Sequence, residues 1–100
     1  MKRGIKHNTH PGELLREEII KANGLSITNT ANLLGITRSN LSNIINEKTA
    51  ISPLMALRIA KVFGGNAELW VRMQASHDLR EAEVTAKNLY LKPYKYEVAR

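Results

Sequence analysis

The sequence predicts an all-α protein of five helices. The chain has 100 residues, enough for one domain with a single modest hydrophobic core. Apolar residues recur at three- and four-residue intervals in five segments, and capping residues, Pro or Gly bound these segments. The second and third segments are short and meet at Gly35, which predicts a tight turn between two packed helices.

The first helix is predicted to begin near His10 and to end at Asn23-Gly24. Pro11 suits its first turn, where a backbone N–H would have no partner within the helix. Its acidic residues come early and Lys21 comes late, as the helix dipole favours. The apolar face expected from the spacing consists of Leu14, Leu15, Ile19 and Ala22.

The second and third helices form the short pair. Ser26 and Thr37 are their predicted N-caps, and the helices should run to about Leu34 and Asn46. Gly35 suits the left-handed conformation at the turn. The small Ala31 would let the two helices approach closely, and the apolar positions that anchor the turn and the third helix are Ile36, Leu41, Ile44 and Ile45.

The fourth helix is predicted to follow the N-cap Ser52 and to close at Gly64-Gly65. The fifth should open near Asn66 and run to about Asn88. The apolar stripe expected on it comprises Leu69, Trp70, Met73 and His77, and Trp70 should pack it against the first and fourth helices.

The short pair predicts a helix-turn-helix, in which the first helix crosses the DNA backbone and the second lies in the major groove. The outward positions of the second are hydrogen-bonding residues with almost no acid, although Glu and Lys form helices better. Asn can bind adenine and Arg guanine through two hydrogen bonds each. We expect Arg38, Ser39, Asn40 and Asn43 nearest the base edges, and Thr28, Asn29, Thr37, Ser42, Asn46 and Lys48 mainly on the backbone. The competing interpretation is an ordinary helical hairpin with a polar surface.

Composition favours a polyanionic partner. The net charge of +6 and pI near 9.9 point most simply to nucleic acid. The absence of Cys excludes disulfides and thiolate metal sites, and no apolar run is long enough to cross a membrane, so a cytoplasmic protein without a cofactor is expected. The histidines (His7, His10 and His77) better suit cap, core or surface roles than a metal site. Glu13, Glu17 and Glu18 suit dipole stabilisation and pairing with Lys21 better than catalysis, so no enzyme is predicted.

The sequence divides into three parts. Residues 1–10 form a basic arm whose Lys2, Arg3 and Lys6 could contact DNA, remain solvated or contact a protein partner. Residues 11–88 are the predicted DNA-binding and dimerisation domain, with spare apolar surface for a homodimer on the fifth helix at Leu79, Ala82, Val84 and Ala86. Residues 89–100 are a tail in which Tyr90, Tyr94 and Tyr96 alternate with Lys92 and Lys95. Base stacking, strand docking to a protein and disorder all remain open for this tail.

Three segments resemble the HigA/VapI-type antitoxins, a branch of the Xre (lambda-repressor-like) helix-turn-helix family. They are HPGELLREEI at residues 10–19, ITRSNLSNIINEK at 36–48 and SPLMALRIAKVFGGNAELWVRMQASHDL at 52–79. The last is the most specific, because the generic repressor motif does not include it. The chain departs from the family pattern at Ile27, where a DNA-contacting Gln is common, at Thr30, often Leu, and at Glu47, usually Gly.

The resemblance implies a five-helix domain that dimerises and represses transcription from its own promoter by binding a palindromic, double-stranded DNA operator. It also implies a protein partner, a HigB-like toxin of the RelE-like class that cleaves mRNA and that the antitoxin neutralises in a type II toxin–antitoxin pair. The alternative is a stand-alone Xre-type transcriptional regulator without a toxin partner.

Overall fold

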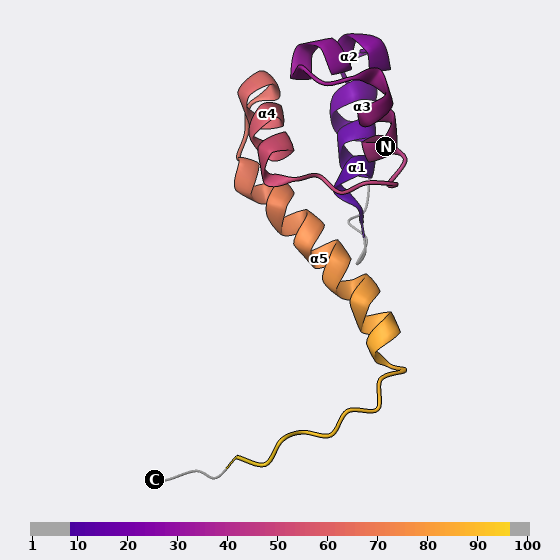
Figure 1. Ribbon diagram of the computed structural model, residues 1–100. Helices are drawn as coiled ribbons and strands as arrows, with labels where there is room; N and C mark the ends of the chain where they lie inside the picture. The colour runs from indigo at the N-terminus through magenta and orange to yellow at the C-terminus, as the bar shows by residue number, and fades with distance from the viewer. Residues whose placement is uncertain (1–8, 97–100) are drawn as a thin grey trace.

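The computed structural model describes residues 9–96, which fold into helices and contain no strand. The helices lie side by side as a small body from which the last one projects (Figure 1). Their bounds are α1 (Pro11–Leu14), η1 (Leu15–Lys21), α2 (Ile27–Leu34), α3 (Arg38–Ile45), α4 (Pro53–Phe63) and α5 (Ala67–Ala86). Because η1 continues α1 without a break, the described chain has the five helical segments that the sequence predicts.

The first helix changes its winding after one turn. From Leu15 to Lys21 it is a π-helix, whose wider turn brings residues five apart onto one side. Leu15 and Ile20 are therefore the buried pair. The predicted α-helical face was wrong at Ala22, which is exposed, whereas Leu14 and Ile19 are half-buried and pack against the core. The wider winding moves the buried stripe by one residue.

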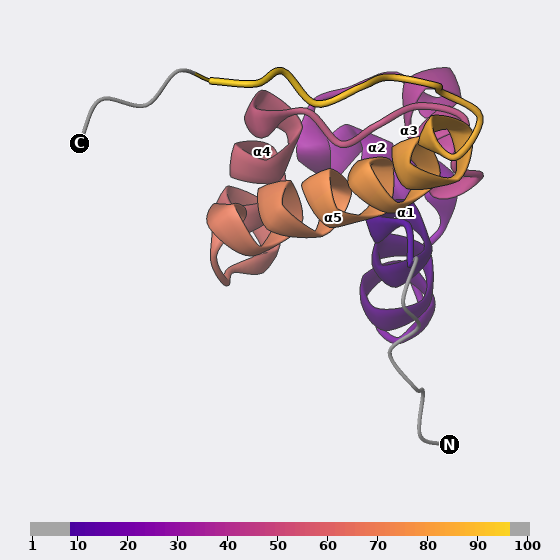
Figure 2. The same cartoon turned by 90° about the horizontal axis from the view of Figure 1, so that it is seen from below.

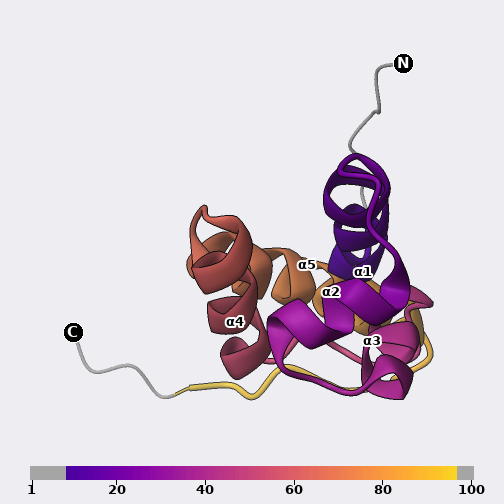
Figure 3. The ribbon, with the colours of Figure 1, turned by 90° about the horizontal axis from the view of Figure 1, so that it is seen from above.

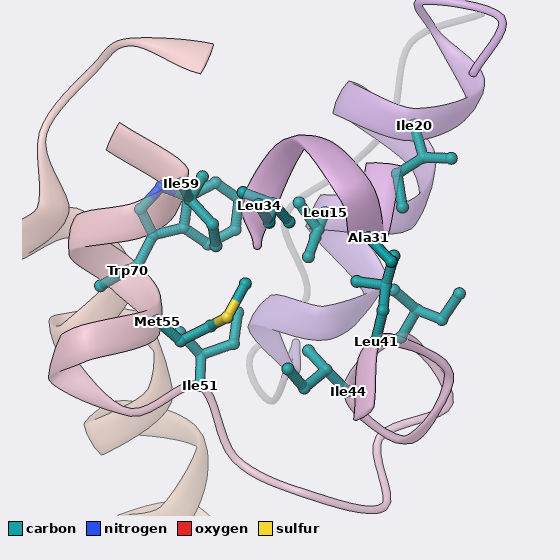
Figure 4. Packing of buried hydrophobic residues seen from close by; sticks show 12 residues of the cluster. Leu15, Ile20, Ala31, Leu34, Leu41, Ile44, Ile51, Met55, Ile59 and Trp70 are labelled. Carbon is teal, nitrogen blue, oxygen red and sulfur yellow. The ribbon is translucent and has the colours of Figure 1, made fainter. Parts of the chain in front are cut away.

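The core draws side chains from every helix and from the loop before α4 (Figure 4). Leu15, Leu34, Leu41 and Ile59 lie at its centre and are almost wholly inaccessible to solvent. Thr30 is also fully buried. Its hydroxyl donates to the Ser26 carbonyl oxygen at 2.8 Å, so the one polar atom that it brings into the core has a partner.

Pro11 and Gly12 set the distance between α1 and α3. Both residues are buried. A methyl group on Gly12 would overlap the carbonyl oxygen of Ile44 and would press on the ring of His10. The backbones of the first and third helices thus touch at this point, which only Gly permits.

His10 is the N-cap of α1, as its position in the sequence suggests. Its Nδ1 accepts a hydrogen bond from the Gly12 amide at 2.9 Å, and its ring packs edge-on against His77 of α5, with centroids 4.8 Å apart. Burial first, and then the neighbouring His77, lower the pKa of His10 from its usual 6.5, against smaller opposing effects of Glu47 and Asp78. The ring is therefore neutral at pH 7 and keeps the lone pair that caps the helix.

Only the first part of α5 belongs to the core. Trp70 and Gln74 are its buried residues, and Trp70 lies beside Ile59 of α4 in Figure 4, while α5 also contacts α1. The predicted stripe was wrong at Leu69, which is 54% exposed, because it lies about 100° around the helix from Trp70. Gln74 takes the inward position instead, one turn after Trp70. From Asp78 onward every described residue is exposed, and α5 extends away from the body in Figure 1, whereas the view from below in Figure 2 looks up at its exposed end.

Gln74 ties the loop before α4 to α5. Its Oε1 accepts from the amide of the buried Ile51 at 2.8 Å, and its Nε2 donates to Asp78 at 2.9 Å.

Between residues 9 and 96, no helix is long and apolar enough to cross a membrane.

The end of α3 carries an unusual backbone conformation. Glu47 adopts φ 64°, and the amides of Glu47 and Lys48 donate to the carbonyl oxygens of Ile44 and Asn43 at 3.0 and 2.8 Å. This is the Schellman termination, whose left-handed residue is usually Gly. A side chain at this position costs about 1 kcal/mol.

We expect Gly12→Ala to lower the free energy of unfolding by about 3 kcal/mol, because the added methyl group overlaps backbone that has nowhere to move. The measurement is urea denaturation followed by circular dichroism. At an uncrowded helical position the same change would stabilise the protein by about 1 kcal/mol, so an unchanged or raised midpoint would disprove the close approach.

We expect Glu47→Gly to raise the free energy of unfolding by about 1 kcal/mol, since glycine adopts the left-handed conformation without strain. Glu47→Ala is the matched control, because it removes the same carboxylate and keeps the strained backbone. Thermal unfolding compares the two variants. Equal stabilisation by both would assign the gain to the lost charge instead.

Candidate nucleic-acid interface

The interface begins at the first turn of α2. The Ser26 hydroxyl accepts from the Asn29 amide at 3.0 Å and caps this helix, as predicted. Because Thr30 and Ala31 face the core, the preceding Thr28 and Asn29 face solvent. Both lie in the first turn of α2, and the N-terminus of a helix attracts phosphate. Ile27, the departure from the usual Gln, is half-buried and packs against the core.

The turn between α2 and α3 is held by local and distant contacts. Gly35 is left-handed, with φ 71°, and the Ile36 amide donates to the Ala31 carbonyl at 3.0 Å. Arg58, from the middle of α4, donates through Nη1 to the Leu34 carbonyl at 2.9 Å and to the Gly35 carbonyl at 3.3 Å. The carbonyl groups at the end of α2 are thus satisfied by a guanidinium from another helix.

The start of α3 is a run of exposed residues. Thr37 accepts from the Asn40 amide at 3.0 Å and is the predicted N-cap. Arg38, Ser39 and Asn40 follow as three exposed residues, none of them acidic, while Leu41, Ile44 and Ile45 anchor the opposite side in the core. Figure 3 shows α2 and α3 beside each other at one edge of the molecule.

The candidate residues further along α3 and in the loop after it are less available to a ligand. Ser42 and Asn43 are half-buried. Asn46 is exposed, but its side-chain amide donates to the Ser42 carbonyl at 2.9 Å and lies 3.3 Å from the Ser42 hydroxyl. Lys48 is exposed in the loop that follows α3, next to the acidic Glu47. Eight of the ten candidate residues are therefore exposed, and four of them are consecutive, from Thr37 to Asn40 at the start of α3.

The structure also shows the surroundings of the glutamates considered for catalysis and of the histidines considered for metal binding. Glu17 pairs with Arg16 at 3.2 Å and with Lys21 at 3.3 Å, as an ordinary helix-surface carboxylate does. His10 meets His77, but no set of three His, Asp or Glu side chains in residues 9–96 is arranged to hold a metal ion. His7 and the arm residues Lys2, Arg3 and Lys6 lie outside the described residues.

Sequence reasoning missed Gly12, Arg58 and Gln74, the residues that position this surface from other elements. The only local signal was a glycine directly after the helix-starting Pro11. Arg58 bonds to residues 23 and 24 positions before it in the sequence. Gln74 bonds to Ile51, 23 positions before it, as well as to the nearby Asp78. No local pattern could reveal those distant contacts.

Comparison with known proteins extends these observations. A helix-turn-helix family model matches residues 15–70. Virulence-associated protein I of Dichelobacter nodosus is 43% identical over 74 residues, which make up 74% of this chain and 68% of that protein. An uncharacterised helix-turn-helix transcriptional regulator of Escherichia coli K12, YbaQ, is 36% identical over 83 residues, covering 83% of this chain and 74% of that protein.

Solved structures share the fold over most of the chain. Antitoxin GraA in complex with its operator superposes with a TM-score of 0.80 at 34% identity and covers 99% of both chains. Pseudomonas aeruginosa antitoxin HigA with the higBA promoter gives a TM-score of 0.77 at 29% identity, over 80% of this chain and 87% of that one. The protein thus belongs to the Xre-type helix-turn-helix family, in the branch of the HigA-type antitoxins and virulence-associated protein I.

Proposed function

We propose that this protein is the antitoxin of a type II toxin–antitoxin pair and a repressor of its own promoter. The observation that carries the DNA-binding part is the exposed, acid-free start of α3, held at a fixed turn by Gly35 and Arg58. The operator and promoter complexes of GraA and HigA support the same function. In this proposal the chain is a cytoplasmic binding protein, not an enzyme.

In the proposed complex α3 enters the major groove. Arg38, Ser39 and Asn40 stand nearest the base edges, and the half-buried Asn43 reads only a base that approaches closely. Backbone contacts come from the first turn of α2, from Thr37 and from Lys48. Ser42 and Asn46 hydrogen-bond each other at the end of α3, so they stabilise that end and contribute less to the backbone contacts.

The protein would act as a homodimer, because a palindromic operator mirrors a two-fold protein. The exposed half of α5 offers the contact surface, since Leu79 is 58% and Val84 65% exposed and Ala82 and Ala86 leave room for a close approach. Two α3 helices then meet half-sites about one helical turn apart.

A second candidate function is a stand-alone transcriptional regulator, which the similarity to YbaQ favours. The two functions differ in their protein partner. The antitoxin function requires that the chain bind and inactivate a small RelE/HigB-like ribonuclease from the neighbouring reading frame. Co-expression decides between them: restored growth and a copurifying complex support the antitoxin, and unrelieved toxicity supports the regulator.

DNA binding is tested by fluorescence anisotropy of the purified chain on its own upstream DNA and on a scrambled duplex, over a range of salt concentrations. We expect a preference of at least about a thousandfold for the native fragment. Equal and steeply salt-dependent binding to both duplexes would leave only charge attraction and would overturn the operator claim.

We expect Arg38→Ala to weaken operator binding by roughly 1–3 kcal/mol and to relax the preference at one base position. Lys48→Ala is the matched control, because it removes the same charge from a backbone-facing position. It should weaken all sequences alike and lower the salt dependence. Binding to a panel of single-base operator variants separates the two, and an unchanged base preference in Arg38→Ala would refute its role.

A further inference from the structure

Arg58 of α4 holds the turn between α2 and α3 with only part of its guanidinium group. Its Nη1 donates to the carbonyl oxygens of Leu34 and Gly35, and these two bonds use both hydrogens of that nitrogen. Within residues 9–96, no acceptor pairs with its Nε or Nη2. Neither nitrogen is sealed in the core, since Arg58 is half-buried and neither is a fully buried atom without a partner. Three of the five N–H donors of this arginine are therefore available to a ligand.

The positive charge of Arg58 is also without a carboxylate partner. Residues 9–86, the helical body, contain eight Lys and Arg and eight Asp and Glu, so the chain's excess of +6 lies outside them. Half of these cations pair with carboxylates of their own helix, on η1 or α5: Arg16, Lys21, Arg72 and Arg80. The cations that form no ion pair with the described part of the chain lie on α3, on α4 or between them: Arg38, Lys48, Arg58 and Lys61.

Arg58 lines a groove between the start of α3 and the first half of α4, which we call the α3–α4 groove. Its volume is about 210 Å³, enough for several water molecules. Asn40 of the candidate interface and the α4 N-cap Ser52 also line it, and Ile44 and Met55 supply apolar walls. The Ser52 hydroxyl accepts from the Met55 amide at 3.1 Å, so its own hydrogen remains able to donate. The α3–α4 groove thus has room for an anionic group and donors from both helices.

DNA bound at α3 brings phosphates to this groove. The major groove of DNA is about 12 Å wide, and an α-helix with its side chains is about 10–12 Å across. A helix that enters the major groove therefore has the sugar–phosphate walls directly beside it. Asn40 belongs both to the exposed start of α3 and to the α3–α4 groove, so the two surfaces are continuous.

We propose that the α3–α4 groove binds one phosphate of the DNA backbone and that Arg58 holds it through Nε–H and Nη2–H. These two N–H groups lie parallel on one edge of the planar guanidinium, and phosphate oxygens accept well from such a pair. Because Nη1 stays bonded to the turn, the phosphate site is fixed relative to the first turn of α3. This inference rests on the proposed function and adds a backbone contact from outside the helix-turn-helix.

The test uses a panel of operator duplexes, each with one backbone phosphate replaced by a neutral methylphosphonate. Anisotropy compares wild-type protein with Arg58→Gln on every duplex. Wild type should lose about tenfold in affinity at one position of each half-site, as expected for one charged hydrogen-bonded contact. Arg58→Gln should bind more weakly overall but lose nothing further at that position, because the partner of the phosphate is already gone. If every methylphosphonate weakens both proteins by the same factor, Arg58 only supports the turn and the proposal is overturned.

Lys61→Gln is the matched control, since Lys61 is an exposed cation of the same helix that does not line the α3–α4 groove. It should keep the full loss at every position, and a selective relief at the same phosphate would overturn the proposal. Circular dichroism checks that Arg58→Gln is folded. If it is not, Arg58→Lys replaces it: this variant keeps the charge without the parallel pair, so the loss should shrink at that phosphate alone. Equal losses in Arg58→Lys and wild type at every position would again overturn the proposal.

Free phosphate is the other source of the same chemistry. The panel is therefore repeated with inorganic phosphate in place of chloride at equal ionic strength. Stronger competition against wild type than against Arg58→Gln, with equal losses across the panel, would assign the α3–α4 groove to a free anion and overturn the proposal. Failure of the proposed function is recognised separately, because wild-type protein would then show no preference for the operator over a scrambled duplex.

Discussion

The contact between Gly12 and the backbone of Ile44 is the constraint on which the rest of the structure depends. It brings the first helix against α3 with no side chain between them. At this distance the core side chains of α1, η1 and α3 meet directly, and α2 and α4 close over them. Since the inner side of α3 is fixed by this contact, its outer side presents Arg38, Ser39 and Asn40 to solvent in a defined orientation. A base-reading surface requires this rigidity, because hydrogen bonds to base edges tolerate little displacement.

Long polar side chains then attach the remaining parts to this pair of helices. Arg58 binds the turn after α2, Gln74 binds the loop before α4, and His10 joins the start of α1 to α5. Each satisfies a backbone group near the edge of a small core, where water would otherwise compete. A neutral His10 suits this role, because a proton on Nδ1 would remove the acceptor of the Gly12 amide.

Hydrogen-bonding groups and excess positive charge lie in different parts of the chain. The helical body carries balanced charge and presents hydrogen-bonding groups, whereas the excess positive charge is held in the terminal segments. Under the proposed function, this arrangement would keep phosphate attraction from dominating at α3. A surface that binds every duplex strongly discriminates poorly, so under the proposed function a helical body without net charge favours selectivity over affinity.

The sequence by itself determined the helices and their caps. Ser26, Thr37 and Ser52 were identified as N-caps and Gly35 as the left-handed turn because these depend on neighbouring backbone alone. The family followed from motifs along the chain, and the ten proposed DNA contacts stay predictions until they are measured. Only the tertiary structure decided the π winding of η1, the contact at Gly12 and the roles of Arg58 and Gln74. These depend on atoms brought together from distant parts of the chain, and local periodicity carries no information about such contacts.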